Sequence, residues 1–215
     1  MKKISKKQTL NFFTYYGWTI PTFLVAFWVI FFFIFQNVYA AKRYQKLVIF
    51  YAAYNLKDKS LHSKLKENLK PYGCLEIDYY SYALNDSQIV TNYNALKDIC
   101  DYSVLSEQDL KDMKDTINSQ YMSLTNDFLE RVKAPTNYEY YSYNDTKYGF
   151  KIYDKDNEAY NQMTGFDQYV NFVQGDKTDN FYLVTHIKSV NFNDEKGHVL
   201  GYYGLEYLLN GTITK

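Results

Sequence analysis

Cysteine and histidine, from which many metal centres are built, are scarce in this sequence. There are two cysteines and three histidines among 215 residues. The histidines, His62, His186 and His198, lie far apart, and none belongs to HExxH or another ligand spacing. The sequence therefore predicts no metal site.

The two cysteines, Cys74 and Cys100, leave two structural alternatives open. Neither lies in a CxxC pair or near a histidine, so redox chemistry has no support. Outside a membrane, two cysteines at this separation can form a disulfide. They can equally remain two buried free thiols.

Motifs of common catalytic sites are also missing. The chain has no GxSxG, no P-loop and no GxGxxG. Carboxylates are plentiful, but no pair stands in an apolar setting that would separate their pKa values. We therefore predict no catalytic residues, no cofactor and no enzymatic activity; an envelope hydrolase is a third alternative without a nucleophile–base pair to support it.

Charge is absent from Thr9 to Ala41, and Phe12–Phe35 is strongly apolar. A bilayer core needs roughly 20 such residues in a helix. We predict a tail at 1–10 and a transmembrane helix, a signal anchor, at 11–41, with Pro21 kinking it or marking its first buried turn. The alternative is a cleaved signal peptide, because Val38-Tyr39-Ala40 resembles a cleavage site.

The flanking charges predict the orientation of this segment. Lys2, Lys3, Lys6 and Lys7 precede it, against Lys42, Arg43 and Lys46 after it. A short basic tail is easily retained on the cytoplasmic side. We therefore expect a single-pass protein of the cell membrane, in contact with the lipid bilayer, with a cytoplasmic N-terminus and an extracytoplasmic main domain.

Beyond residue 41 the chain is mildly acidic, with 20 basic and 24 acidic side chains. Clustered basic residues are what nucleic-acid backbones require, so we predict no nucleic-acid partner. This part also holds 22 of the 25 tyrosines. They reflect either a coding bias that also favours Lys and Asn, or a surface or cleft that uses phenol rings.

Residues 42–135 alternate between strand and helix patterns. Lys46–Tyr54, Cys74–Tyr82 and Tyr102–Leu105 are apolar runs typical of strands. Between them, apolar residues recur at helical spacing and predict two helices, at Leu61, Leu65 and Leu69 and at Ile89, Tyr93 and Leu96. A last helix opens at the capping box Ser106–Asp109 and has its apolar face at Leu110, Met113, Ile117, Tyr121 and Leu124. This alternation predicts an α/β lobe with a doubly wound sheet.

Residues 136–215 do not continue this strand–helix alternation. Their pattern predicts a small α+β part of the same extracytoplasmic domain. Tyr138–Tyr143 and Phe150–Tyr153 flank a plausible hairpin turn. A short helix is expected around Phe166–Val173, a strand at Phe181–Ile187, and a closing helix at Val199–Leu209 that Gly201 and Gly204 weaken.

The order of these elements after an apolar segment resembles the type II extracytoplasmic solute-binding proteins of ABC importers. Lys46–Tyr54 and Cys74–Tyr82 resemble their first two strands, and Asp101–Ser106, an aspartate followed by apolar and small polar residues, resembles the third. Lys147–Tyr153 resembles the strand after the crossover, and Phe181–Val184 with Ser189 a late strand. That family has two full lobes, so the resemblance implies a shortened, membrane-anchored form.

The resemblance implies ligand contacts at the carboxyl ends of the first and third strands, as is general for open α/β sheets. These positions are Tyr54 and Asn55, then Ser106 and Glu107. Rings for stacking on a sugar or a cation would come from three tyrosines: Tyr82, Tyr141 and Tyr148. Helix capping by Ser106 and packing by the tyrosines are the structural alternatives.

Two functions follow as expectations. The first is a tethered solute-binding-like domain that presents a small polar solute to an ABC permease or a sensor. The second is a non-enzymatic interaction module, whose tyrosine-rich face holds another membrane or envelope protein without a small-molecule ligand.

Overall fold

The computed structural model describes residues 14, 17, 19–36, 40–52, 55–58, 60–81, 98–172 and 179–214. The chain divides into two compact units, Met1–Ala41 and Lys42–Lys215. The helix predicted around Ile89–Leu96 lies outside the described residues.

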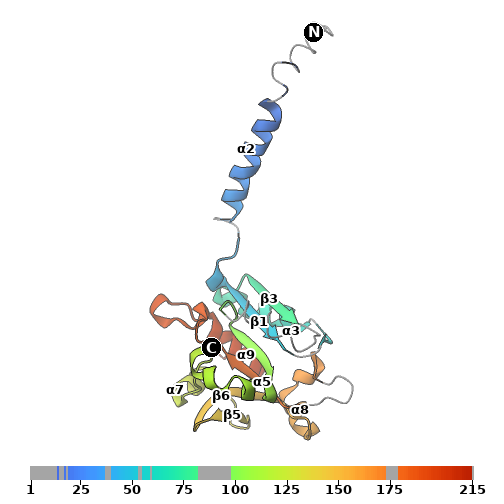
Figure 1. Cartoon of the computed structure of the whole chain (residues 1–215), viewed down its shortest axis with the longest axis vertical. Helices are drawn as coiled ribbons and strands as arrows, with labels where there is room; N and C mark the ends of the chain where they lie inside the picture. Colours follow the sequence, from blue (N-terminus) through green and yellow to red (C-terminus); the bar gives the residue numbers. More distant parts are fainter. Residues whose placement is uncertain are drawn as a thin grey trace. The chain divides into compact units, whose positions relative to one another are not determined.

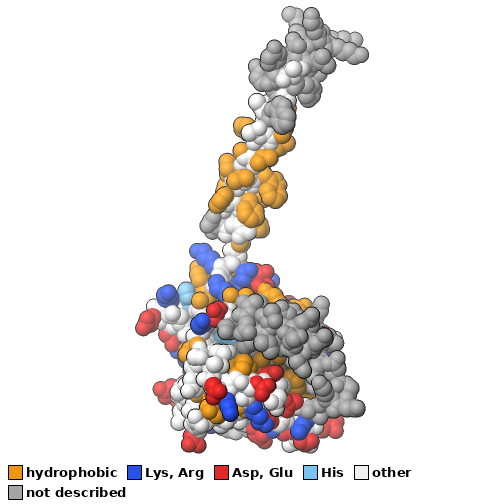
Figure 2. Space-filling view, in the orientation of Figure 1, with side chains coloured by type: hydrophobic (Ala, Val, Ile, Leu, Met, Phe, Trp, Pro, Cys, Tyr) orange, Lys and Arg blue, Asp and Glu red, His pale blue; other side chains and the backbone are white. Residues whose placement is uncertain are grey.

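The first unit contains one described helix, α2 (Thr19–Ile34). Pro21 lies in its first turn, where a missing backbone N–H costs nothing. Large apolar side chains are exposed along its whole length, from Ile20 to Ile34 (Figure 2). Among the described residues, no helix combines the length and the hydropathy of a membrane span.

The second unit is built on a six-stranded mixed sheet in the order β3-β1-β4-β8-β6-β5 (Figure 1). Its first three strands are parallel and its last three pairings are antiparallel. The strands are β1 (Lys46–Tyr51), β3 (Glu76–Ser81), β4 (Tyr102–Ser106), β5 (Tyr140–Tyr143), β6 (Thr146–Tyr153) and β8 (Phe181–Thr185). The predicted α/β class is confirmed, but the sheet is mixed, because strands from residues 136–215 extend it with antiparallel pairings.

Helices cover both faces of this sheet, as side-chain alternation along β1 shows. Leu47, Ile49 and Tyr51 pack in one core with α3 (Ser60–Leu69), α7 (Asn126–Arg131) and α9 (Leu200–Asn210). Val48 and Phe50 pack on the other face with α5 (Glu107–Asp112) and α6 (Ile117–Gln120). A strand buried on both faces explains why Lys46–Tyr54 reads as a continuous apolar run.

The second unit also contains a small two-stranded sheet. It pairs β2 (Asn55–Leu56) with β7 (Val170–Asn171), and the elements that precede β7 are α8 (Glu158–Thr164) and η5 (Phe166–Gln168). The helix expected around Phe166–Val173 is present only as the single 3₁₀ turn η5, and it is wrong from Val170, where the chain forms β7. Gly165 has a φ of +68° and ends α8, and the chain then turns to pair with β2.

The helix predicted from Ser106 onward begins as expected but is broken. Ser106 caps α5, which ends at Asp112; η4 (Lys114–Thr116) and α6 follow, and Tyr121 leaves the helix. The cause is tertiary: Tyr121 bridges to His186, and the Met122 amide donates to Thr185 O at 2.9 Å. Sheet pairing has replaced the last helical turn.

The remaining short helices are turns of 3₁₀ type. They lie between the larger elements and are η2 (Arg43–Gln45), η3 (Lys70–Tyr72), η6 (Val190–Phe192) and η7 (Asp194–Lys196).

Glycine explains how α9 can lie directly on the sheet. A Cβ on Gly204 would come within 2.6 Å of the Tyr102 hydroxyl and 2.7 Å of a Leu47 methyl carbon. A Cβ on Gly201 would meet the Phe192 ring. The glycines that weakened the helix prediction are therefore those that allow the helix to pack here.

Candidate functional site

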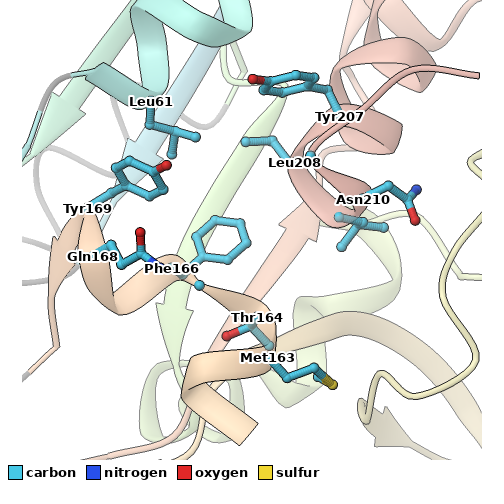
Figure 3. Close-up of a pocket in the computed structure, with 12 residues that line it drawn as sticks. Leu61, Met163, Thr164, Phe166, Gln168, Tyr169, Tyr207, Leu208 and Asn210 are labelled. Atoms are coloured by element: carbon cyan, nitrogen blue, oxygen red, sulfur yellow. The ribbon is translucent and has the colours of Figure 1, made fainter.

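The candidate site is a pocket of about 260 Å³ between α3, the α8–η5 segment and the end of α9. Leu61, Phe166 and Leu208 form its floor; Figure 3 shows these side chains pointing toward one another from three elements. They are 7 %, 3 % and 7 % exposed, so the floor is well packed.

Aromatic and amide groups form the rim. The lining includes Tyr169 and Tyr207, and Gln168 and Asn210 add side-chain amides. Burial raises the pKa of Tyr207, so its hydroxyl is neutral at physiological pH. The twelve lining residues include no Asp, Glu, Lys or Arg. The pocket therefore offers apolar surface and neutral hydrogen-bonding groups.

Two helix ends shape the pocket. Both α8 and α9 end at a glycine in the left-handed conformation, Gly165 (φ +68°) and Gly211 (φ +69°), and both glycines line it. The Tyr169 carbonyl accepts hydrogen bonds from the Lys57 and Asp58 amides at 2.7 and 3.3 Å. These bonds tie η5 to the segment that follows β2.

The predicted ligand residues have other neighbours. Ser106 caps α5: its hydroxyl accepts from the Asp109 amide at 3.0 Å and donates to the Asp109 carboxylate at 2.7 Å. Glu107 pairs with Lys111 and accepts from the Asn180 side chain at 2.7 Å, and hydrogen bonding by Lys111 lowers its pKa. Both side chains thus support the start of α5, directly after β4.

The predicted tyrosines pack in the core. Tyr141 is 9 % exposed and meets Tyr182 edge to face, while Tyr148 is 5 % exposed and donates to Asn118. Asn55 lies in β2 opposite Asn171, and its side chain is outside what the structure describes. Tyr54 and Tyr82 lie outside the described residues. Ser106, Glu107, Tyr141 and Tyr148 do not line the pocket.

Cys74 and Cys100 are both buried free thiols, in different core clusters. The structure therefore corresponds to the second of the two alternatives for this pair. Burial raises the pKa of Cys74 and raises that of Cys100 to about 12. Both thiols are accordingly protonated and unreactive at neutral pH.

A buried Ser–His pair was missed by the sequence reasoning. Ser103 Oγ lies 2.6 Å from His186 Nε2, because β4 and β8 are paired although they lie far apart in the chain. Ser103 is 0 % exposed and His186 1 %. A hydroxyl with no access to solvent cannot attack a substrate, so we interpret the pair as a polar link within the sheet.

A second polar cluster surrounds Asp101, which is 0 % exposed. Its carboxylate accepts from the Val48 amide at 2.7 Å, from Arg43 and Asn191 at 3.0 Å each, and from the Ser189 hydroxyl. Burial raises the pKa of Asp101, and the hydrogen bonds and the charge of Arg43 oppose that rise. This cluster fixes η2, where the chain enters the second unit, to β1, β4 and the η6 turn.

Within the described residues, no group of three His, Cys, Asp or Glu side chains is arranged to hold a metal ion. The chain matches no model of a protein family, no curated protein and no solved structure. The pocket is thus the feature on which a functional interpretation must stand.

Proposed function

We propose that the chain is a membrane-tethered, extracytoplasmic, non-enzymatic binding domain that holds a small polar solute and presents it to a permease or a sensor. The pocket between α3, η5 and α9 carries this proposal. An ABC permease is the proposed partner, in line with the resemblance to type II solute-binding proteins.

The location of the pocket supports the proposal. Leu61 lies in the first turn of α3, which follows the carboxyl end of β1 in the chain. Open α/β sheets bind ligands beyond the carboxyl ends of their parallel strands. The pocket occupies that end of the sheet although different residues from those predicted line it.

The lining supports a neutral solute with one apolar face. Sugars combine such a face with hydroxyl groups, and tyrosine rings pack against it while amides take the hydroxyls. A solute with a net charge would lose its hydration here without gaining an oppositely charged side chain. We therefore propose a sugar or a similarly neutral polyol.

The tether is proposed from the sequence and from α2. No charged residue interrupts Thr9–Ala41, and α2 exposes apolar side chains all round. A helix that is hydrophobic on every side is suited to a non-aqueous environment. Lys2, Lys3, Lys6 and Lys7 support a cytoplasmic N-terminus.

Thermal unfolding with a panel of sugars, amino acids and polyamines tests solute binding. A true ligand at 100 times its Kd should add about 2.7 kcal/mol to the stability of the domain. Tyr169→Ala, at the rim, should abolish the shift. Tyr143→Ala is the matched control, because Tyr143 is also half-buried but lies in β5, away from the pocket.

An interaction module is the second candidate, and the sheet favours it. The strands of 42–215 that the structure describes form one six-stranded and one two-stranded sheet, without a second full lobe. A binder that closes between two lobes needs both. Absence of a shift with every ligand class would favour this candidate over solute binding.

A further inference from the structure

Exposed apolar side chains of the second unit gather at one end of the sheet. Among its described residues, six large hydrophobic side chains are exposed, and all but Met163 lie beside the amino ends of the parallel strands. We call these five the amino-end face: Tyr44, Leu75, Ile99, Ile187 and Val190, which are 36 %, 47 %, 43 %, 52 % and 37 % exposed.

Hydrogen bonds show that these residues are neighbours. The Leu75 amide donates to Gln45 O at 2.8 Å, and Arg43 donates to the Ile99 carbonyl. Val190 lies between Ser189 and Asn191, whose side chains donate to the Asp101 carboxylate. The amide of His186, the residue before Ile187, donates to the Asp101 carbonyl at 3.0 Å. Hydrogen bonds of the Asp101 cluster thus connect the chain segments that carry the amino-end face.

The face also carries groups typical of a membrane interface. Tyr44 stacks on His198 with ring centroids 4.4 Å apart, and Lys42 lies 5.9 Å from the Tyr44 ring centroid. Lys188 is exposed and pairs with Asp98 at 2.8 Å. Figure 2 shows basic side chains with hydrophobic ones beside them where the chain enters the folded unit. Tyrosine and lysine beside aliphatic side chains suit the headgroup region of a bilayer.

We propose that the amino-end face rests on the lipid bilayer and orients the domain on the membrane. The proposal depends on the tether proposed above. Lys42, which begins the folded unit, directly follows the uncharged run that ends at Ala41. A tether this short keeps the face at high effective concentration near lipid, so a few aliphatic side chains suffice for contact.

The lipid surface is favoured over a protein partner by this proximity and by the composition of the face. The apolar side chains are separated by charged pairs, Lys188–Asp98 and Lys46–Glu76, which remain partly exposed. A protein interface would have to desolvate those pairs at its centre, whereas the headgroup region leaves them hydrated.

Site-specific fluorescence on the full chain tests the proposal. Single cysteines replace Ile187 or Val190 on the face, and Ser63→Cys is the control, since Ser63 is exposed but lies in the first half of α3, which follows the carboxyl end of β1 in the chain. The thiols are labelled with an environment-sensitive dye at neutral pH, where buried Cys74 and Cys100 react little. The unsubstituted chain gives the background.

Each labelled chain is reconstituted into palmitoyl-oleoyl-phosphatidylcholine vesicles, with and without lipid carrying a quencher near the headgroup. We expect blue-shifted, lipid-quenched emission at Ile187→Cys and Val190→Cys, and solvent-like, unquenched emission at Ser63→Cys. Equal, solvent-like emission at all three sites in chains that float with the vesicles would overturn the orientation and leave the tether intact. Chains that fail to float with the vesicles would overturn the tether, and the orientation with it.

Discussion

Lys151 faces a buried part of the sheet, with only 10 % of its side chain exposed, and holds two carboxylates there. It bonds Glu139 at 2.9 Å and also Asp154, which is 14 % exposed. Burial alone would lower the pKa of Lys151, but these two bonds raise it; the Lys151 bond likewise lowers the pKa of Asp154 against its burial. The three side chains therefore depend on one another.

Replacing Lys151 by Met should destabilise the domain by about 2 kcal/mol, because Asp154 loses its cation in a mostly buried place. Urea unfolding at pH 7 measures this change. Lys111→Met removes the exposed partner of Glu107 and should cost only about 0.4 kcal/mol. Equal losses in both variants would contradict the role given to burial.

The stability lost in Lys151→Met should also depend on pH. Because the folded-state pKa of Asp154 is lowered, its stabilising contribution is present above the unfolded pKa and is lost as pH falls through the folded value. The difference between wild type and Lys151→Met should therefore be constant near neutrality and shrink below about pH 4. Urea titrations between neutral and acidic pH check this; a difference that grows with acid would contradict it.

The buried thiols predict loss of stability in alkali. Unfolded cysteines ionise above about pH 8.5, while burial keeps the folded pKa of Cys100 at about 12 and raises that of Cys74. Stability should fall with pH by up to about 1.4 kcal/mol per unit for each thiol above that point. Cys100→Ala should remove roughly half of the slope between about pH 8.5 and 9.5, measured by thermal unfolding; an unchanged slope would exclude this cause.

Among the elements, α9 shows how packing can depend on the absence of a side chain. Gly204→Ala should destabilise the domain by about 2 kcal/mol, although alanine favours helices, because its Cβ would collide with Tyr102 and Leu47. Ser63→Ala, at an exposed position of α3, is the control and should change stability by less than about 0.5 kcal/mol. Chemical unfolding of both variants measures the contrast; a stabilised Gly204→Ala would show that α9 can move away from the sheet.

Local signals predicted much of the element content. Apolar runs located β1, β3, β4 and β8, and the Ser106 capping box located the start of α5. Those features depend on neighbours in the chain. The exit from α6 at Tyr121 depends on its bridge to His186, and the pairing of β4 with β8 joins residues about 80 positions apart; no local pattern exists for either.

The candidate pocket was beyond prediction for a similar reason. Its floor joins Leu61, Phe166 and Leu208, which the sequence presents as core positions of three separate elements. The only local hints were the glycines at the ends of α8 and α9. Conversely, Ser106, Glu107, Tyr141 and Tyr148 have residue types suited to ligands, but the fold uses them for capping and packing.

For the molecule as a whole, the sheet order joins the two sequence regions 42–135 and 136–215. Strand β8 pairs with β4 on one side and β6 on the other, so the later region completes the sheet begun by the earlier one. A fragment of residues 42–135 should therefore lack cooperative unfolding, whereas 42–215 should unfold in one transition. Circular dichroism with thermal melts tests both; a folded 42–135 fragment would show two independent lobes.

The Asp101 cluster has a mechanical consequence. Tension applied to the chain at Lys42 meets Arg43, which shares one buried carboxylate with the Val48 amide, Ser189 and Asn191. The load is therefore divided among β1, β4 and the turn after β8 at once. Tension at Lys42 would therefore reorient the second unit as a whole before it unfolds any one of these segments.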